Sequence, residues 1–203
     1  MNQAKDDIQL IRQMMERSSS FLSLSGLSGV AAGICALIAS GTCWYLMKEN
    51  NIDYFEGKRN IYPNDLTKIL VLIAILTVIA ALFSGFIFTY RKSKRMQLPL
   101  WTSTTKSLLI HLSIPLVTGG LFCLLLIYHQ LFFLVAPCTL LFYGLALTSA
   151  SKFMHKDIFG LGIFEILLAL FAIIIPGYGL IVWAVGFGLM HIIYGTIMHF
   201  KYQ

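Results

Sequence analysis

Two ionisable residues inside apolar runs, Glu165 and His191, are the positions whose types and spacing could do chemistry. The sequence has nine acidic residues, and Glu165 is the one that lies within an apolar run. His191 lies in the next run, beyond the turn Pro176-Gly177-Tyr178-Gly179. If both runs are helices, each residue lies about 20 Å from the turn, at the same depth. A carboxyl group and an imidazole placed side by side can share or pass on a proton.

Two further polar residues are predicted at nearly this depth. His111 lies about seven residues into the apolar run that begins near residue 104. Tyr143 lies about seven residues before the end of the apolar run that finishes near residue 150. At a helical rise of about 1.5 Å per residue, all four groups fall about 10 Å below one membrane surface. The sequence therefore predicts a candidate proton or ligand site formed by Glu165, His191, His111 and Tyr143.

Small residues share a helix face with each of the two central groups. They recur every three or four residues, the spacing at which side chains lie on one side of a helix. Small side chains let helix backbones approach closely in lipid, so we expect the last two helices to pack against each other through these faces. The residues of this predicted helix-packing seam are Gly162, Ala169, Ala172, Ala184, Gly188 and Gly195.

Three functions remain open for such a site. In the first, Glu165 and His191 form a hydrogen-bonded pair that only locks helix packing, in a structural or regulatory membrane protein. In the second, Glu165 exchanges protons beside His191 and His111, coupled to transport of a small solute or ion. In the third, these residues bind a metal ion, or two histidines bind a haem. The prediction we carry forward is the second, a small proton-linked transporter or channel.

Motifs of soluble catalysis are missing from the sequence. It contains no G-x-S-x-G, no P-loop and no H-E-x-x-H, so we predict that the protein is not an enzyme and assign no catalytic residue. It also lacks H-x-x-x-H and Glu-x-x-His spacings, so no metal is assigned and no cofactor is predicted. The four cysteines lie in apolar runs without C-x-x-C spacing and are expected to be small core residues.

Composition defines the elements that must position these groups. Of the 203 residues, 58% are hydrophobic and only 12% are charged, about half the charged fraction of a soluble domain. Runs of about 20 apolar residues with almost no charge predict transmembrane helices. The sequence therefore predicts an all-α, polytopic bundle of six helices forming a single domain, with spans at about 21–47, 66–90, 104–128, 131–150, 158–175 and 179–200.

The first 20 residues are predicted to be a cytoplasmic segment with a short amphipathic helix over 5–18. Ile8, Ile11, Met14 and Met15 share its apolar face, as in helices that lie in the membrane interface. Acidic residues among the basic ones and the lack of a small-residue cleavage site do not fit a signal peptide.

Positive charge is distributed unequally between the predicted loops. With the N-terminus inside, 11 of the 15 Lys and Arg residues fall on the inner side, so the positive-inside rule predicts that both termini are cytoplasmic. The net charge of +6 is explained by this topology, and we predict no nucleic-acid partner. The cluster Arg91–Arg95 could also hold anionic lipid headgroups; a protein partner or homo-oligomer is left open.

Two segments resemble a known family. They are Leu10–Ser19 with Ser23–Gly29 near the start, and Gly186-Phe187-Gly188-Leu189-Met190-His191-Ile192-Ile193-Tyr194-Gly195 near the end. Both look like the corresponding ends of an uncharacterised family of small bacterial six-span integral membrane proteins. The resemblance implies a bacterial protein of the inner membrane, and it implies no activity.

Overall fold

The computed structural model describes residues 25–52, 62–97, 99–155 and 157–202, and this part of the chain is helical without strands. The all-α fold predicted from the sequence is confirmed. The predicted amphipathic helix over residues 5–18 lies outside the described residues. The long elements are α2 (Gly26–Glu49), α3 (Asn64–Met96), α4 (Ser103–Tyr128), α5 (Val135–Ala150) and α6 (Asp157–Ile174).

The last span is a continuous helix whose type changes along its length from α to π and back to α. It consists of α7 (Gly179–Trp183), a π-helix η4 (Ala184–Met190) and α8 (His191–Tyr202). Short 3₁₀ helices, η2 (Phe132–Leu134) and η3 (Ser151–Phe153), flank α5.

Six helical stretches in the described ranges are long and apolar enough to cross a membrane. They run over Gly26–Glu49, Asn64–Met96, Ser103–Tyr128, Phe132–Phe153, Asp157–Ile174 and Gly179–Tyr202. The largest departure from the predicted boundaries is at α3, which continues six residues beyond 90 and carries the cationic cluster as helix. Lys94 and Arg95 lie in its last turn, where positive charge interacts favourably with the helix dipole.

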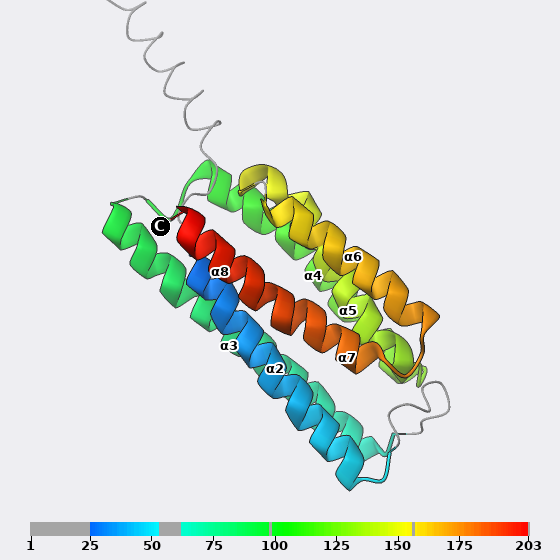
Figure 1. Cartoon of the computed structure of the whole chain (residues 1–203). Helices are drawn as coiled ribbons and strands as arrows, with labels where there is room; N and C mark the ends of the chain where they lie inside the picture. Colours follow the sequence, from blue (N-terminus) through cyan, green and yellow to red (C-terminus); the bar gives the residue numbers. More distant parts are fainter. Residues whose placement is uncertain (1–24, 53–61, 98, 156, 203) are drawn as a thin grey trace, which may run out of the picture.

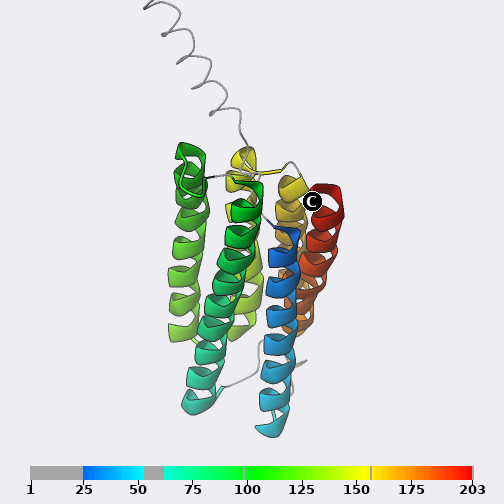
Figure 2. The same ribbon diagram turned by 90° about the vertical axis from the view of Figure 1, so that its left-hand side faces the viewer.

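The helices form an open arrangement with α2 and α3 together at one edge (Figure 1). On its other side, α2 contacts η4 and α8 of the last span. The α7 and η4 segments of this span also contact α6, and α5 packs between α6 and α4. Figure 2 shows the same helices running side by side along one common direction. The described contacts of α3 are mainly with α2, and its most apolar stretch has no buried residue.

Local sequence features set several helix ends. The Thr102 side chain accepts a hydrogen bond from the Thr105 backbone N–H at 3.1 Å, so it caps the start of α4. The turn between α6 and α7 has Gly177 at φ 100°, a backbone conformation that a residue with a Cβ rarely adopts. The last two spans therefore form the hairpin that the sequence indicated.

Glycines bring helix backbones close together, but between pairs of helices other than those we predicted. A Cβ on Gly33 of α2 would lie 2.6 Å from the Gly188 carbonyl oxygen, and a Cβ on Gly195 would lie 2.7 Å from the Val30 backbone nitrogen. Gly188 and Gly195 of the last span therefore face α2.

Gly162 has a different neighbour again. A Cβ on this residue of α6 would lie 2.9 Å from the carbonyl oxygen of Gly144 in α5. Ala169 and Ala172 join a buried cluster with Leu140 of α5 and Val182 of α7. The glycines of the predicted seam therefore pack on α2 and α5 and not on each other, whereas Ala169 and Ala172 of α6 share a buried cluster with Val182 of the last span.

Candidate functional site

Three helical regions bring Glu165, His191 and Tyr143 together inside the bundle. Glu165 comes from the middle of α6, Tyr143 from α5, and His191 from the junction between η4 and α8. Glu165 is 0% exposed and His191 is 6% exposed. The structure thus places three of the four residues of the predicted site in one buried cluster.

Two hydrogen bonds orient the His191 ring. Its Nδ1 lies 3.0 Å from the carbonyl oxygen of Gly186, and its Nε2 lies 2.7 Å from the Tyr143 hydroxyl. Because a carbonyl oxygen only accepts, Nδ1 carries the proton and donates to Gly186. In the neutral ring, Nε2 then accepts from the Tyr143 O–H; in the imidazolium, Nε2–H would donate to the same hydroxyl oxygen.

The Glu165 carboxyl group lies beside this ring without a hydrogen bond of its own. Oε1 is 3.6 Å from His191 Nδ1, an ion-pair distance when the imidazole is protonated. Neither carboxyl oxygen has a hydrogen-bond partner among the described residues, although both are buried. A buried, unpaired carboxylate costs several kcal/mol, so the group requires either its own proton or a charged imidazole next to it.

Gly186 is a site residue that the sequence reasoning missed. It lies in η4, and a Cβ built on it would overlap with Glu165 Oε2 and lie 2.7 Å from Leu140 Cδ2. The absence of a side chain lets the carboxyl group reach the backbone of the π-helix. Glycine also has a weak preference for the α-helix, and π-helical turns occur often at functional sites. The two glycines at 186 and 188 were the available signal in the sequence.

Two aromatic side chains of the last span, Phe187 and Trp183, extend the cluster. The Phe187 ring lies 4.8 Å from the Tyr143 ring and 5.8 Å from the His191 ring, measured between centroids. Trp183 packs on Phe187 at 5.0 Å and donates from Nε1 to the Thr139 hydroxyl at 3.1 Å. Phe187 and Trp183 thus add a row of packed rings to the cluster along the last span.

His111 has other partners than the site to which it was assigned. Its Nδ1 lies 2.8 Å from the Ser107 carbonyl oxygen, one turn earlier in α4, and its ring packs on Phe153 of η3 at 4.9 Å. This contact places His111 beside the end of α5 that leads into η3, and α4 packs on α5 and η3, so His111 does not join Glu165. Among the described residues, no group of three or more His, Cys, Asp or Glu side chains could hold a metal ion.

An apolar layer lies between the buried site and the nearest ends of α6 and α8. Leu161 and Met198 belong to one buried cluster, and Tyr143 packs against it. Leu161 is one turn from Glu165 in α6, and Met198 is two turns from His191 in α8. The site is therefore closed on this side by close-packed hydrocarbon.

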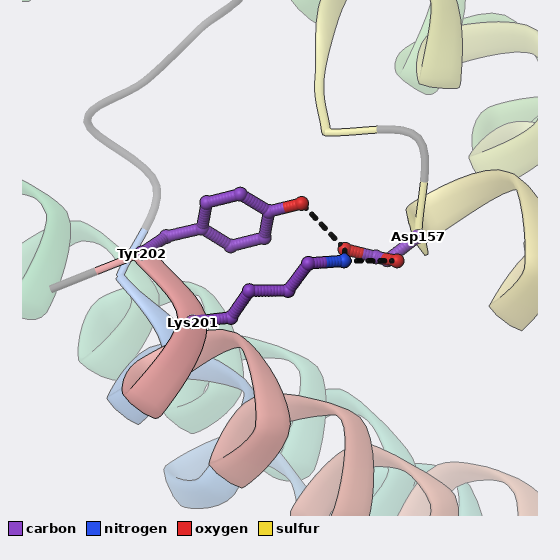
Figure 3. Close-up of polar contacts among 3 residues, drawn as sticks. All are labelled: Asp157, Lys201 and Tyr202. Atoms are coloured by element: carbon purple, nitrogen blue, oxygen red, sulfur yellow. Dashed lines mark hydrogen bonds and ion pairs between the residues drawn. The ribbon is translucent and has the colours of Figure 1, made fainter.

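A polar clamp joins α6 and α8 above this layer (Figure 3). The Lys201 ammonium lies 3.1 and 3.0 Å from the two carboxylate oxygens of Asp157, and the Tyr202 hydroxyl donates to Oδ2 at 2.8 Å. We call these three residues the clamp. It fixes the last turn of α8 against the first turn of α6.

Two further residues support the clamp from other elements. Lys92 of α3 donates to the Tyr202 carbonyl oxygen at 3.2 Å. The His155 ring, between η3 and α6, stacks on the Tyr202 ring at 3.9 Å and is 8% exposed. Burial first, and then the positive charge of Lys92, lower the pKa of His155 below its ordinary value.

The fold defines the class of protein. The six long apolar helices of the described residues, with many large apolar side chains exposed along them, make this chain an integral, multi-pass membrane protein in contact with the lipid bilayer. Comparison with protein-family models, curated proteins and solved structures gives no match. The chemistry of the buried site is therefore what indicates a function.

Proposed function

We propose that the protein is a small proton-linked transporter or channel in which Glu165 binds the proton and His191 is its partner. The observation that carries this proposal is the buried Glu165 carboxyl group, which has no hydrogen bond and lies 3.6 Å from His191 Nδ1. Ionisable groups inside membrane spans are costly and are mostly retained for ion or proton pathways.

The hydrogen-bond pattern favours proton exchange over a static lock. A lock would use the short N–H···O contact between the imidazole and the carboxylate, whereas Nδ1 donates to Gly186 at 3.0 Å. The carboxyl group is thus free to change protonation without breaking a hydrogen bond to His191. Tyr143 satisfies Nε2 in both states of the ring, because a hydroxyl can donate or accept.

The clamp and the apolar layer supply a closed gate in this proposal. Exchange of the proton with the nearer water phase requires α8 to separate from α6 at the clamp, since Leu161 and Met198 fill the space below it. The π-helix and the turn at Gly177 are the places where α8 can change direction. The protein acts here by gating and carries out no enzymatic reaction.

The setting we propose is the bacterial inner membrane with both termini in the cytoplasm. The clamp and the cluster Arg91–Arg95 then lie at the cytoplasmic surface, among the headgroups of that leaflet. The excess of Lys and Arg in the segments on this side supports the orientation.

The second candidate function is structural or regulatory, with the Glu165–His191 pair serving only helix packing. The tight approach of Gly195 to α2 and of Gly162 to α5 favours it, since these contacts already hold the site in place. A metal or haem role has no support from the position of His111. Metal analysis and an absorption spectrum of purified protein test that role directly.

The deciding experiment is Glu165→Gln in proteoliposomes with an internal pH dye. We expect an imposed pH gradient or membrane potential to drive proton flux through the wild type. In the variant we expect this flux to be at least about tenfold lower, because Gln at position 165 cannot bind and release a proton. Glu49→Gln, the same change at an exposed helix end, is the matched control and keeps its flux. Unchanged flux in Glu165→Gln with a lowered melting temperature would establish the packing role instead.

A further inference from the structure

One face of α3 near its C-terminal end forms a groove of about 450 Å³. Its residues recur at intervals of four, so they lie on one side of the helix over slightly more than two turns. Half of the groove is apolar and half is cationic. The residues that line it are Phe86, Ile87, Tyr90, Arg91, Lys94 and Arg95.

The three cations of this groove, Arg91, Lys94 and Arg95, are exposed. In the part of the chain that the structure describes, no carboxylate pairs with Arg91, Lys94 or Arg95. Their neighbour Lys92 points the other way, toward Tyr202. Like charges three and four residues apart on a helix repel each other, so a bound anion would stabilise this turn.

The apolar half of the groove continues into the membrane. The rings of Phe86 and Tyr90 stack with centroids 6.1 Å apart, and Phe83 extends the same exposed surface. From Phe83 to Lys94 the helix rises about 16 Å, close to half of the roughly 30 Å hydrocarbon thickness of a bilayer. One acyl chain with its headgroup spans this distance.

We propose that this groove binds one anionic glycerophospholipid. Its phosphate lies on Arg91, Lys94 and Arg95, and an acyl chain lies along Phe86 and Tyr90. Guanidinium groups match phosphate oxygens in two-point hydrogen bonds, and the aromatic rings exclude a purely aqueous anion from the rest of the groove. The inference goes beyond placement in a charged leaflet because it assigns a discrete site to one lipid. It rests on the membrane placement of α3 and is independent of proton exchange at Glu165.

The test compares lipid retention by the full chain in detergent, measured by native mass spectrometry. Phosphatidylglycerol and phosphatidylcholine with identical acyl chains are added at equal concentration. The wild type is expected to retain phosphatidylglycerol at least about tenfold better. Arg91→Gln with Arg95→Gln is expected to abolish that preference, and Lys106→Gln with Lys152→Gln, the same loss of charge outside the groove, is expected to preserve it.

Three further outcomes decide between this site and simpler explanations. Tyr90→Ala keeps all charges and is expected to weaken retention several-fold, since the acyl chain loses its contact. Equal binding of both lipids, equal loss in the two double variants, or full displacement by inorganic phosphate would each overturn the proposal. Glu165→Gln is expected to retain the lipid like the wild type, so a failed transport assay leaves this result unaffected.

Discussion

Gly186 decides how closely the Glu165 carboxyl group approaches the last span. In Gly186→Ala the new methyl group would overlap with Oε2 and crowd Leu140, so the Glu165 and Leu140 side chains must shift. We expect a loss of about 1–3 kcal/mol in the free energy of unfolding, the usual cost of overpacking a core. Thermal unfolding in detergent measures the loss, and the flux assay measures the effect on proton exchange.

Gly120→Ala is the matched control for this change. Gly120 is exposed in α4, and a Cβ there meets nothing within 4 Å. Alanine has the better helix preference by about 1 kcal/mol, so this variant is expected to be as stable as the wild type or slightly more stable. Equal losses in both variants would show that the space around Gly186 is unimportant.

The Tyr143 hydroxyl is the hydrogen-bond donor that satisfies His191 Nε2 in its neutral state. Tyr143→Phe removes this bond at 2.7 Å and leaves a buried nitrogen without a partner, at an expected cost of about 1–3 kcal/mol. Tyr194→Phe is the control, because the Tyr194 hydroxyl makes no hydrogen bond to a described residue. If both variants unfold at the same temperature, the assigned bond contributes nothing.

At the scale of single residues, the sequence predicts which side chains form the buried site better than it predicts their contacts. An acidic residue inside an apolar run predicts a buried site by itself, and hairpin symmetry gives the depth of His191 relative to Glu165. The sequence gives no information on which helices are neighbours. His111 was therefore assigned to the site by its expected depth alone, and it lies against Phe153 instead. Gly186 was overlooked because its role depends on a π-helical turn, which shifts the helix face by one residue.

The clamp is the contact that holds the ends of α6 and α8 together. Asp157→Asn removes the charge that binds Lys201 and accepts from Tyr202. We expect amide hydrogen exchange in the last turn of α8 to become several-fold faster, because local opening becomes easier while the buried core is unchanged. Asp65→Asn, which breaks an exposed pair with Lys68 inside one helix, is expected to leave that turn unaffected.

His155 makes the stability of this end depend on pH. Its pKa is lowered from 6.5 by burial and by Lys92 and Lys201, against the opposing effect of Asp157, so the folded protein favours the neutral ring. The contribution to stability is therefore complete above about pH 6.5 and is lost as the pH falls through the lowered pKa. We expect His155→Phe, which keeps the stacking on Tyr202, to remove this loss from melting curves recorded across pH. His129→Phe, in the exposed turn after α4, is expected to retain it.

Helix positions follow closely from the sequence, and helix pairing does not. Apolar runs bounded by polar turns gave six spans, because lipid requires each span to satisfy its own backbone hydrogen bonds. The extension of α3 to Met96 was missed because charged residues end an apolar run without ending a helix. The small residues at 188 and 195 predict a close contact, but the spacing alone does not say that the partner is α2.

At the scale of the whole molecule, the arrangement leaves α3 attached mainly through α2. The buried site lies where α5, α6 and the last span meet, so a movement of α8 away from α6 would also move α2 through its glycine contacts. The groove on α3 and the bond from Lys92 to Tyr202 would then follow the same movement. A continuous set of helix contacts thus connects α3 to the proposed gate between α6 and α8.

The orientation of this bundle can be tested with two glutamines that are alike in structure. Gln97 follows α3 and Gln130 follows α4; both are exposed, and both adopt a left-handed backbone conformation, with φ of 53° and 59°. They lie at opposite ends of the α4 span, so they face opposite sides of the membrane. Each is replaced by Cys in a variant whose four native cysteines are Ala.

The positive-inside rule predicts the outcome of this labelling, since Gln97 follows the Arg91–Arg95 cluster and the outer turn at Gln130 carries no Lys or Arg. In intact cells a membrane-impermeant maleimide is expected to label Gln130→Cys at least about tenfold more than Gln97→Cys. Permeabilised cells are expected to label both equally, because the two positions match in exposure and backbone conformation. The reverse pattern in intact cells would place the clamp and the lipid groove at the outer surface, where gating would respond to external pH.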